Sequence, residues 1–248
     1  MARSAERKDD GWRQVRPRPL AIALVITTLS LPVLPPNTLA APIPLATPEG
    51  LRLLSSSHAR SDYGSLAQEF LTQATLTYCG VASSVMVLNS LRLPAPEVPG
   101  YGTYRFWTQE NLWSGTDSTV VVSADQVQRQ GMTLIELATL LRSHGLRVEA
   151  IHGQELTLAR FRKRLQESLN NPADRLLVNY DRKALGQKGG GHISPVAAYH
   201  AASDQVLILD VSRYRYPTVW VPLQDLWQAI RTVDPGSGKS RGMVLIRR

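Results

Sequence analysis

The stretch QATLTYCGVASSVMVLNSL, residues 73–91, contains the side chain whose chemistry is easiest to predict. Cys79 is the only cysteine among the 248 residues, and an apolar run at helical spacing follows it. The unpaired N–H groups and the dipole at a helix N-terminus stabilise a thiolate, which is the nucleophilic form of cysteine. The sequence therefore predicts a nucleophile at Cys79, although a lone cysteine is also commonly a small buried hydrophobe.

A nucleophilic thiol needs a base, which can come from a distant part of the sequence. His192 opens a predicted strand, directly after three glycines that leave room for a ligand beside the backbone. Asp210 ends the apolar run VLILD on the next predicted strand, and a hairpin would bring the two residues together. A buried carboxylate needs a partner, which an imidazole N–H would provide. We predict that His192 is the base and Asp210 orients it, although a strand-edge histidine and a turn-capping aspartate would look the same.

Gln73 precedes Cys79 by six residues. Its side-chain amide and the backbone N–H of Cys79 would together form an oxyanion hole, which stabilises the tetrahedral intermediate of acyl transfer. The order Gln, Cys-Gly, His, Asp along the chain is that of papain-like cysteine acyltransferases and proteases.

Periodicity and turn residues predict the elements that position these side chains. Helices come mainly before an antiparallel sheet, which is typical of an α+β fold. Residues 41–60 read as an extended lead-in, and the proline-rich residues 91–107 read as a surface loop. We expect helices at 79–89, within 131–146 (Thr133 as cap, Gly145 as stop), at 157–169 and at 223–230, and strands at 175–180, 192–200, 205–214 and 242–248.

The first 40 residues have the pattern of a signal peptide. A basic stretch precedes the apolar run 20–34, and small residues follow it. That run is shorter than the roughly 20 residues needed to span a bilayer. We therefore expect cleavage near Ala40, a single catalytic domain at 41–248, a periplasmic or secreted location, and no stable membrane contact after cleavage. A membrane anchor facing the periplasm is the alternative.

Composition excludes several functions. The net charge is +8, but no basic patch with interleaved aromatics is present, so we expect no nucleic-acid partner. One cysteine cannot form an internal disulfide or a thiolate metal cluster, and we predict no metal ligands. The segment PGSGKS, residues 235–240, has the wrong spacing for a phosphate-binding loop.

Three segments resemble a known family: FLTQATLTYCGVASSVMVLNSL, GGHISPVAAYH and DVSRYRYPTVWVPLQDLWQAI. They are similar to the phytochelatin synthases (glutathione γ-glutamylcysteinyltransferases), particularly the short prokaryotic members, over about residues 68–230. The resemblance implies a papain-like fold. It implies a triad of Cys79, His192 and Asp210, with Gln73 as oxyanion donor and Arg213 as a residue that holds a substrate carboxylate.

The resemblance also implies an activity. The enzyme would cleave the Cys–Gly bond of glutathione through a γ-glutamylcysteinyl thioester on Cys79 and pass the acyl group to water or to a second glutathione, which makes phytochelatin for metal detoxification. No cofactor is expected, although cadmium or zinc could activate as thiolate complexes. The main acyl acceptor and a homodimer are left open. A papain-like protease that processes peptides and a catalytically silent thiol-peptide binder are the alternatives.

Overall fold

A computed structural model describes Met1, residues 41–117 and residues 119–248 of the protein. Apart from Met1, the predicted signal peptide lies outside the described residues. Among the residues that the structure describes, no helix is long and apolar enough to cross a membrane.

The described residues form a seven-stranded antiparallel sheet in the order β1-β6-β5-β4-β3-β7-β2. Its long central strands are β3 (Asp174–Asp181) and β4 (Gly191–His200), which pair from Leu176 with Val196 to Asp181 with Gly191. This pairing places the end of β3 beside the start of β4, where His192 lies. The remaining strands are β1 (Ile43–Pro44), β2 (Arg147–His152), β5 (Gln205–Ile208), β6 (Val219–Pro222) and β7 (Gly242–Arg247).

Four of the α-helices in the described residues begin at side-chain caps that the sequence supplies. Thr133 accepts a hydrogen bond from the N–H of Glu136, whose carboxylate binds the Thr133 N–H in return, and this capping box begins α5. Thr157 caps α6 in the same way through one bond. The helices are α1 (Pro48–Ser56), α2 (Tyr63–Gln68), α3 (Cys79–Ser90), α4 (Ala124–Gln130), α5 (Leu134–Ser143), α6 (Leu158–Leu169) and α7 (Leu223–Arg231), with short 3₁₀ turns η1 (Gly153–Glu155) and η2 (Arg182–Leu185).

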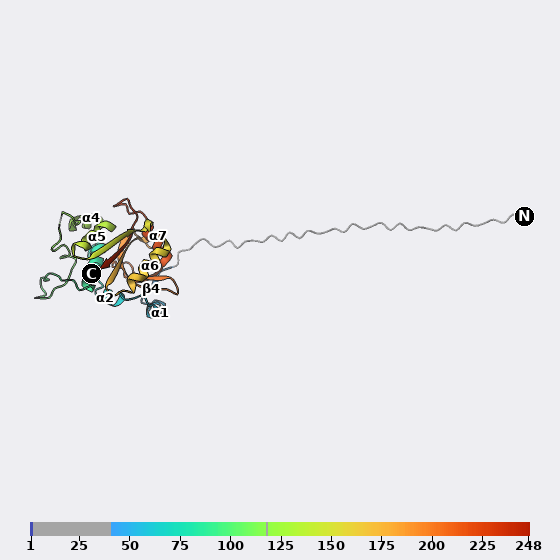
Figure 1. The fold of residues 1–248 in the computed structure, drawn as a ribbon, viewed down its shortest axis with the longest axis horizontal. Coiled ribbons are helices and arrows are strands. Elements are labelled where there is room, and N and C mark those ends of the chain that lie inside the picture. Colours follow the sequence, from blue (N-terminus) through green and yellow to red (C-terminus); the bar gives the residue numbers. More distant parts are fainter. Residues whose placement is uncertain (2–40, 118) are drawn as a thin grey trace. The chain divides into compact units, whose positions relative to one another are not determined.

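Helices cover both faces of the sheet (Figure 1). Neighbouring side chains on a strand point to opposite faces. Leu177 of β3 therefore packs with α3 and α5, whereas Leu176 and Val178 pack with α6 and α7. Burial on both faces, worth roughly 1.5–3 kcal/mol for each large aliphatic side chain, makes the central strands a rigid platform.

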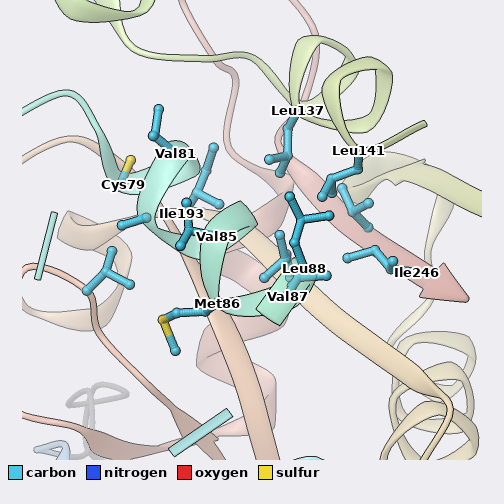
Figure 2. Close-up of a cluster of buried hydrophobic side chains, with 14 of the residues drawn as sticks. Cys79, Val81, Val85, Met86, Val87, Leu88, Leu137, Leu141, Ile193 and Ile246 are labelled. Atoms are coloured by element: carbon cyan, nitrogen blue, oxygen red, sulfur yellow. The ribbon is translucent and has the colours of Figure 1, made fainter. Parts of the chain in front are cut away.

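Figure 2 shows how α3 enters one of these layers. Cys79 lies at the first turn, and Val85 and Leu88 continue the helix into a cluster with Leu137 of α5 and Ile246 of β7. The helix is buried on nearly its whole circumference, because every residue from Cys79 to Leu88 is buried. The nucleophile candidate is therefore held by the core.

The α+β class predicted from the sequence is confirmed, as are the predicted helices at α3, α5, α6 and α7 and the predicted strands at β3, β4 and β7. The extended lead-in at 41–60 is wrong. Thr47 caps α1 there, and Pro48 occupies its first turn. The predicted strand 205–214 is too long, because β5 ends at Ile208 and Asp210 follows it.

Candidate active site

Cys79 is the first residue of α3, with Tyr78 in the N-cap position. The glycine that follows it is closely packed. A Cβ at Gly80 would lie 3.2 Å from both Ile193 Cδ1 and Met132 Sδ, so these side chains would have to shift slightly to admit a larger residue. The buried hydroxyl of Ser83 donates a hydrogen bond to the Ile193 carbonyl at 3.2 Å. These contacts fix the N-terminus of α3 against the strand that carries His192.

His192 is the second residue of β4 and is buried. Its Nε2 lies 2.9 Å from Oδ1 of Asp210, so Nε2–H donates and Nδ1 is the ring nitrogen that is left for the thiol. The Tyr180 ring packs edge-to-face on the imidazole, with centroids 5.6 Å apart. The ring of His192 is therefore held between a carboxylate and an aromatic side chain.

Asp210 is completely buried and accepts hydrogen bonds from several directions. Besides His192, it accepts from the backbone N–H of Ser212 at 2.8 Å and from the guanidinium of Arg182 at 2.7 and 2.9 Å. Burial raises the pKa of Asp210, but His192 and Arg182 outweigh burial and hold the pKa below its ordinary value. The carboxylate is therefore ionised in the folded protein.

The Cys79–His192 pair favours charge separation. Burial raises the pKa of the Cys79 thiol, but the His192 side chain and the N–H groups of Ile193 and Gly80 outweigh it, and the net pKa is lowered. Burial lowers the pKa of His192, but its hydrogen bonds to Asp210 and Cys79 outweigh it, and the net pKa is raised. Both shifts favour a thiolate beside an imidazolium, which is the reactive form of a cysteine nucleophile.

Gln73 and Arg213 are placed less directly. The buried Gln73 donates from its backbone N–H to the Val211 carbonyl at 3.0 Å and from Nε2 to the Thr75 carbonyl at 2.7 Å, and its Oε1 has no partner among the described residues. Arg213 is exposed, and its Cζ lies 4.8 Å from the centroid of the Phe70 ring. The structure therefore brings Cys79, His192 and Asp210 together, whereas the proposed contacts of Gln73 and Arg213 are with groups of the substrate.

Cys79 and His192 line a cleft of about 610 Å³. Arg241 lines it as well, and its Nη1 donates to Oδ1 of Asn179 at 2.9 Å and lies 3.7 Å from Oδ2 of Asp234. Nε of Arg241 and Nδ2 of Asn179 are buried without a partner in the part of the chain that the structure describes. The lining of the cleft therefore combines the Cys79 thiol with the guanidinium of Arg241 and the carboxylate of Asp234. Other residues that line it include Leu76, Met132, Glu136, Asp181, Lys183 and Val233.

Sequence reasoning missed Arg182, Asn179, Asp234 and Arg241. Asp234 lies one residue before PGSGKS, the segment that fails as a phosphate-binding loop, and Pro235 and Gly236 of that segment line the cleft. No local pattern marks these residues, because their partners come from distant parts of the chain. Among the described residues, no group of three or more His, Cys, Asp or Glu side chains could hold a metal ion.

The comparison with known proteins covers the part of the chain that contains the site residues. A family model described as phytochelatin synthase matches residues 33–243. The chain is 36% identical over 210 residues to glutathione gamma-glutamylcysteinyltransferase 3 of Lotus japonicus. The aligned region covers 82% of this chain and 42% of the relative. The chain is also 32% identical over 213 residues to the glutathione gamma-glutamylcysteinyltransferase of Schizosaccharomyces pombe. That aligned region covers 86% of this chain and 50% of the relative. The chain spans half or less of the length of these relatives, and it belongs to the phytochelatin synthase family.

Proposed function

We propose that the protein is a papain-like acyltransferase or hydrolase that cleaves the Cys–Gly peptide bond of glutathione. The observation that carries the proposal is the arrangement of Cys79, His192 and Asp210, with Cys79 and His192 in the lining of a cleft, in a chain of this family. Thiolate, imidazole and carboxylate are sufficient for this chemistry, and we propose no resident metal or cofactor. Cadmium or zinc would act as thiolate complexes of the substrate.

The first half-reaction makes a thioester. Nδ1 of His192 holds the thiol proton, and the Cys79 sulfur attacks the carbonyl carbon of the Cys–Gly bond. Gln73 Nε2 has a second N–H beyond its bond to Thr75, and this N–H and the Cys79 backbone N–H would stabilise the oxyanion. His192 then gives its proton to the glycine nitrogen, the C–N bond breaks, and glycine leaves. The γ-glutamylcysteinyl group remains on the Cys79 sulfur.

The cleft fits the other end of the substrate. The γ-glutamyl group of glutathione ends in an α-carboxylate and an α-ammonium. Arg241 and Asp234 line the cleft, so the Arg241 guanidinium would donate to the carboxylate and the Asp234 carboxylate would accept from the ammonium. An acyl group bound in this way would extend from Cys79 along the cleft.

The second half-reaction passes the acyl group to water or to the α-amine of a second glutathione. Water gives γ-Glu-Cys, and the amine gives (γ-Glu-Cys)₂-Gly. Arg213 is the candidate for binding a carboxylate of a substrate, because it is exposed and stacked on Phe70. The relative yield of the two products depends on how well the amine is positioned against water.

A protease that processes peptides is the competing function. A protease that cleaves ordinary peptides would not require a γ-linked glutamate in its substrate. Arg241 and Asp234 together would recognise the free α-carboxylate and α-ammonium, a pair that only a γ-linked glutamate presents. The discriminating experiment compares glutathione with its α-glutamyl isomer, α-Glu-Cys-Gly. Release of glycine from glutathione at more than about 10 times the rate from the isomer is expected, by loss of at least one charge-assisted bond.

Mass analysis of the products would check the cleaved bond, with Cys79→Ser as the control that should be inactive. Equal rates on the two isomers, or cleavage of longer peptides with no release of glycine from glutathione, would favour the protease.

A further inference from the structure

Arg182 makes the most enclosed ion pair of the site. It begins η2, directly after β3, and its side chain is 3% exposed against 0% for Asp210. Nη1 lies 2.7 Å from Oδ2 of Asp210 and Nη2 lies 2.9 Å from Oδ1, so the guanidinium binds the carboxylate with two parallel bonds. Oδ1 is also the oxygen that accepts from Nε2 of His192. Arg182 and His192 therefore share one carboxylate.

The guanidinium is itself held on several sides. Nη1 also donates to Oε1 of Gln187 at 2.7 Å, and Cζ lies 4.8 Å from the centroid of the Tyr216 ring. The backbone N–H of Arg182 donates to the Gly190 carbonyl at 3.1 Å. The loop that leads into His192 thus wraps around Arg182. A lysine could keep the charge there, but it could not make two parallel bonds to the carboxylate.

We infer that Arg182 is a positioning residue that acts on the Cys79–His192 pair through Asp210. The two parallel hydrogen bonds from its guanidinium fix the plane of the Asp210 carboxylate. Its positive charge offsets the negative charge of this carboxylate beside His192. The inference rests on the proposed role of the triad. Alkylation of Cys79 tests it without turnover of glutathione, so its failure can be told apart from failure of the proposed function.

The two parts of this role have different consequences. Without the two parallel hydrogen bonds from Arg182, the Asp210 carboxylate can rotate. The His192 imidazole then loses its fixed orientation toward the thiol. Without the charge, the carboxylate stabilises the imidazolium more strongly, and the thiolate loses a nearby cation. The charged and titratable groups of the described residues that face this pair are Arg182 from η2, Tyr180 from β3, Cys79 from α3, Asp210 after β5, and Arg241, which lies against Gly191.

The experiment measures the rate of Cys79 alkylation by iodoacetamide against pH, together with kcat on glutathione. Cys79 is the only cysteine, so the label reports one site. For Arg182→Lys we expect kcat to fall about 10–100-fold, as for other residues that orient a histidine ligand or base, with an unchanged pH profile of alkylation. For Arg182→Met we expect the same loss and a shift of the pH profile of alkylation by about half to one unit, because removal of the charge changes the electrostatic balance of the Cys79–His192 pair.

The matched control is Arg175→Lys. Arg175 is a buried arginine of β3, the strand that Arg182 follows, and its hydrogen bonds within the described residues include Ser65 and Ser90 but no member of the triad. It should lose stability without a change in the alkylation profile or in kcat for the folded fraction. If Arg182→Met does not fold, Arg182→Gln removes the same charge. Full kcat in Arg182→Lys, or a profile for the charge-removing variant that superimposes on that of the original protein, would overturn the inference.

Discussion

Gly191 has no side chain at the place that the guanidinium of Arg241 occupies. A Cβ there would come within 2.6 Å of Cζ of Arg241, and Gly191 directly precedes His192. The absence of a side chain at Gly191 thus lets the cation lie in the wall of the cleft, one residue from the base.

Gly191→Ala is expected to displace Arg241 and leave the fold intact, because the group that must move is the end of a flexible side chain. Loss of a charge-assisted bond to substrate predicts a fall in kcat/KM for glutathione of about 10–100-fold, mainly through KM. Steady-state kinetics checks this. Gly190→Ala is the control, since its Cβ would meet no atom within 4 Å. If Gly191→Ala acts through Arg241, adding it to Arg241→Met should change nothing further; additive losses would contradict this account.

Asp210→Asn is expected to lose activity by about 10⁴-fold, by analogy with serine triads in which the wrong tautomer of histidine is held. It should also lower the free energy of unfolding by about 3–5 kcal/mol, because it leaves Arg182 buried without its anion. Denaturant unfolding of Asp210→Asn, Arg182→Met and the double variant separates the two effects. The double variant should recover part of the stability and none of the activity. A double variant with restored turnover would show that Asp210 does not orient the base.

Asp62 is expected to make the protein less stable as pH rises. Burial raises the pKa of this carboxyl from 3.8 to about 8, with a partial offset from Arg175 and a small addition from Asp174, and neither oxygen has a hydrogen-bond partner among the described residues. Between these two pH values the folded protein keeps the proton and the unfolded chain does not. The free energy of unfolding therefore falls by up to about 1.4 kcal/mol per pH unit in that window.

Asp62→Asn should remove this dependence and be more stable than the original protein, by a margin that grows from pH 5 to pH 8. Urea unfolding of both proteins at several pH values is the measurement. Parallel curves, with a constant difference in the free energy of unfolding, would mean that Asp62 is ionised in the folded protein.

The N-terminus is expected near Ala41 in protein recovered from its native cell. The basic stretch, the short apolar run and the small residues before that point are the signals for cleavage after export. N-terminal sequencing or intact-mass measurement checks it. Recovery of chains that begin at Met1 would leave the membrane anchor as the better explanation of the apolar run.

The parts of the fold that the sequence predicts correctly are those that local sequence patterns determine. The apolar spacing after Cys79 and the capping box at Thr133 act within a few residues, so they are readable from the sequence. Thr47 followed by Pro48 is also a readable helix start, so the prediction of an extended segment there neglects a local signal. The short strands β2 and β6 were missed, because they are defined mainly by pairing with distant strands.

The same distinction applies to the site. Cys79, His192 and Asp210 stand out because each lies at a break between a readable element and a loop. Arg182 does not stand out, since its carboxylate is 28 residues away and is reached only after β4 and β5 have paired. Arg241 does not stand out either, because its guanidinium occupies the space that a side chain at Gly191 would fill. The two residues come together only when β3 and β7 have paired.

The most direct test of the central claim is the intact mass of the protein, acid-quenched shortly after mixing with glutathione. The account predicts an adduct with the mass of γ-Glu-Cys less one water, on Cys79, together with release of one glycine per adduct. Cys79→Ser should show no such adduct. An adduct with the mass of glutathione less two hydrogens would be a mixed disulfide, and its presence without the lighter adduct, or glycine release that survives in Cys79→Ser, would contradict the acyl-enzyme mechanism.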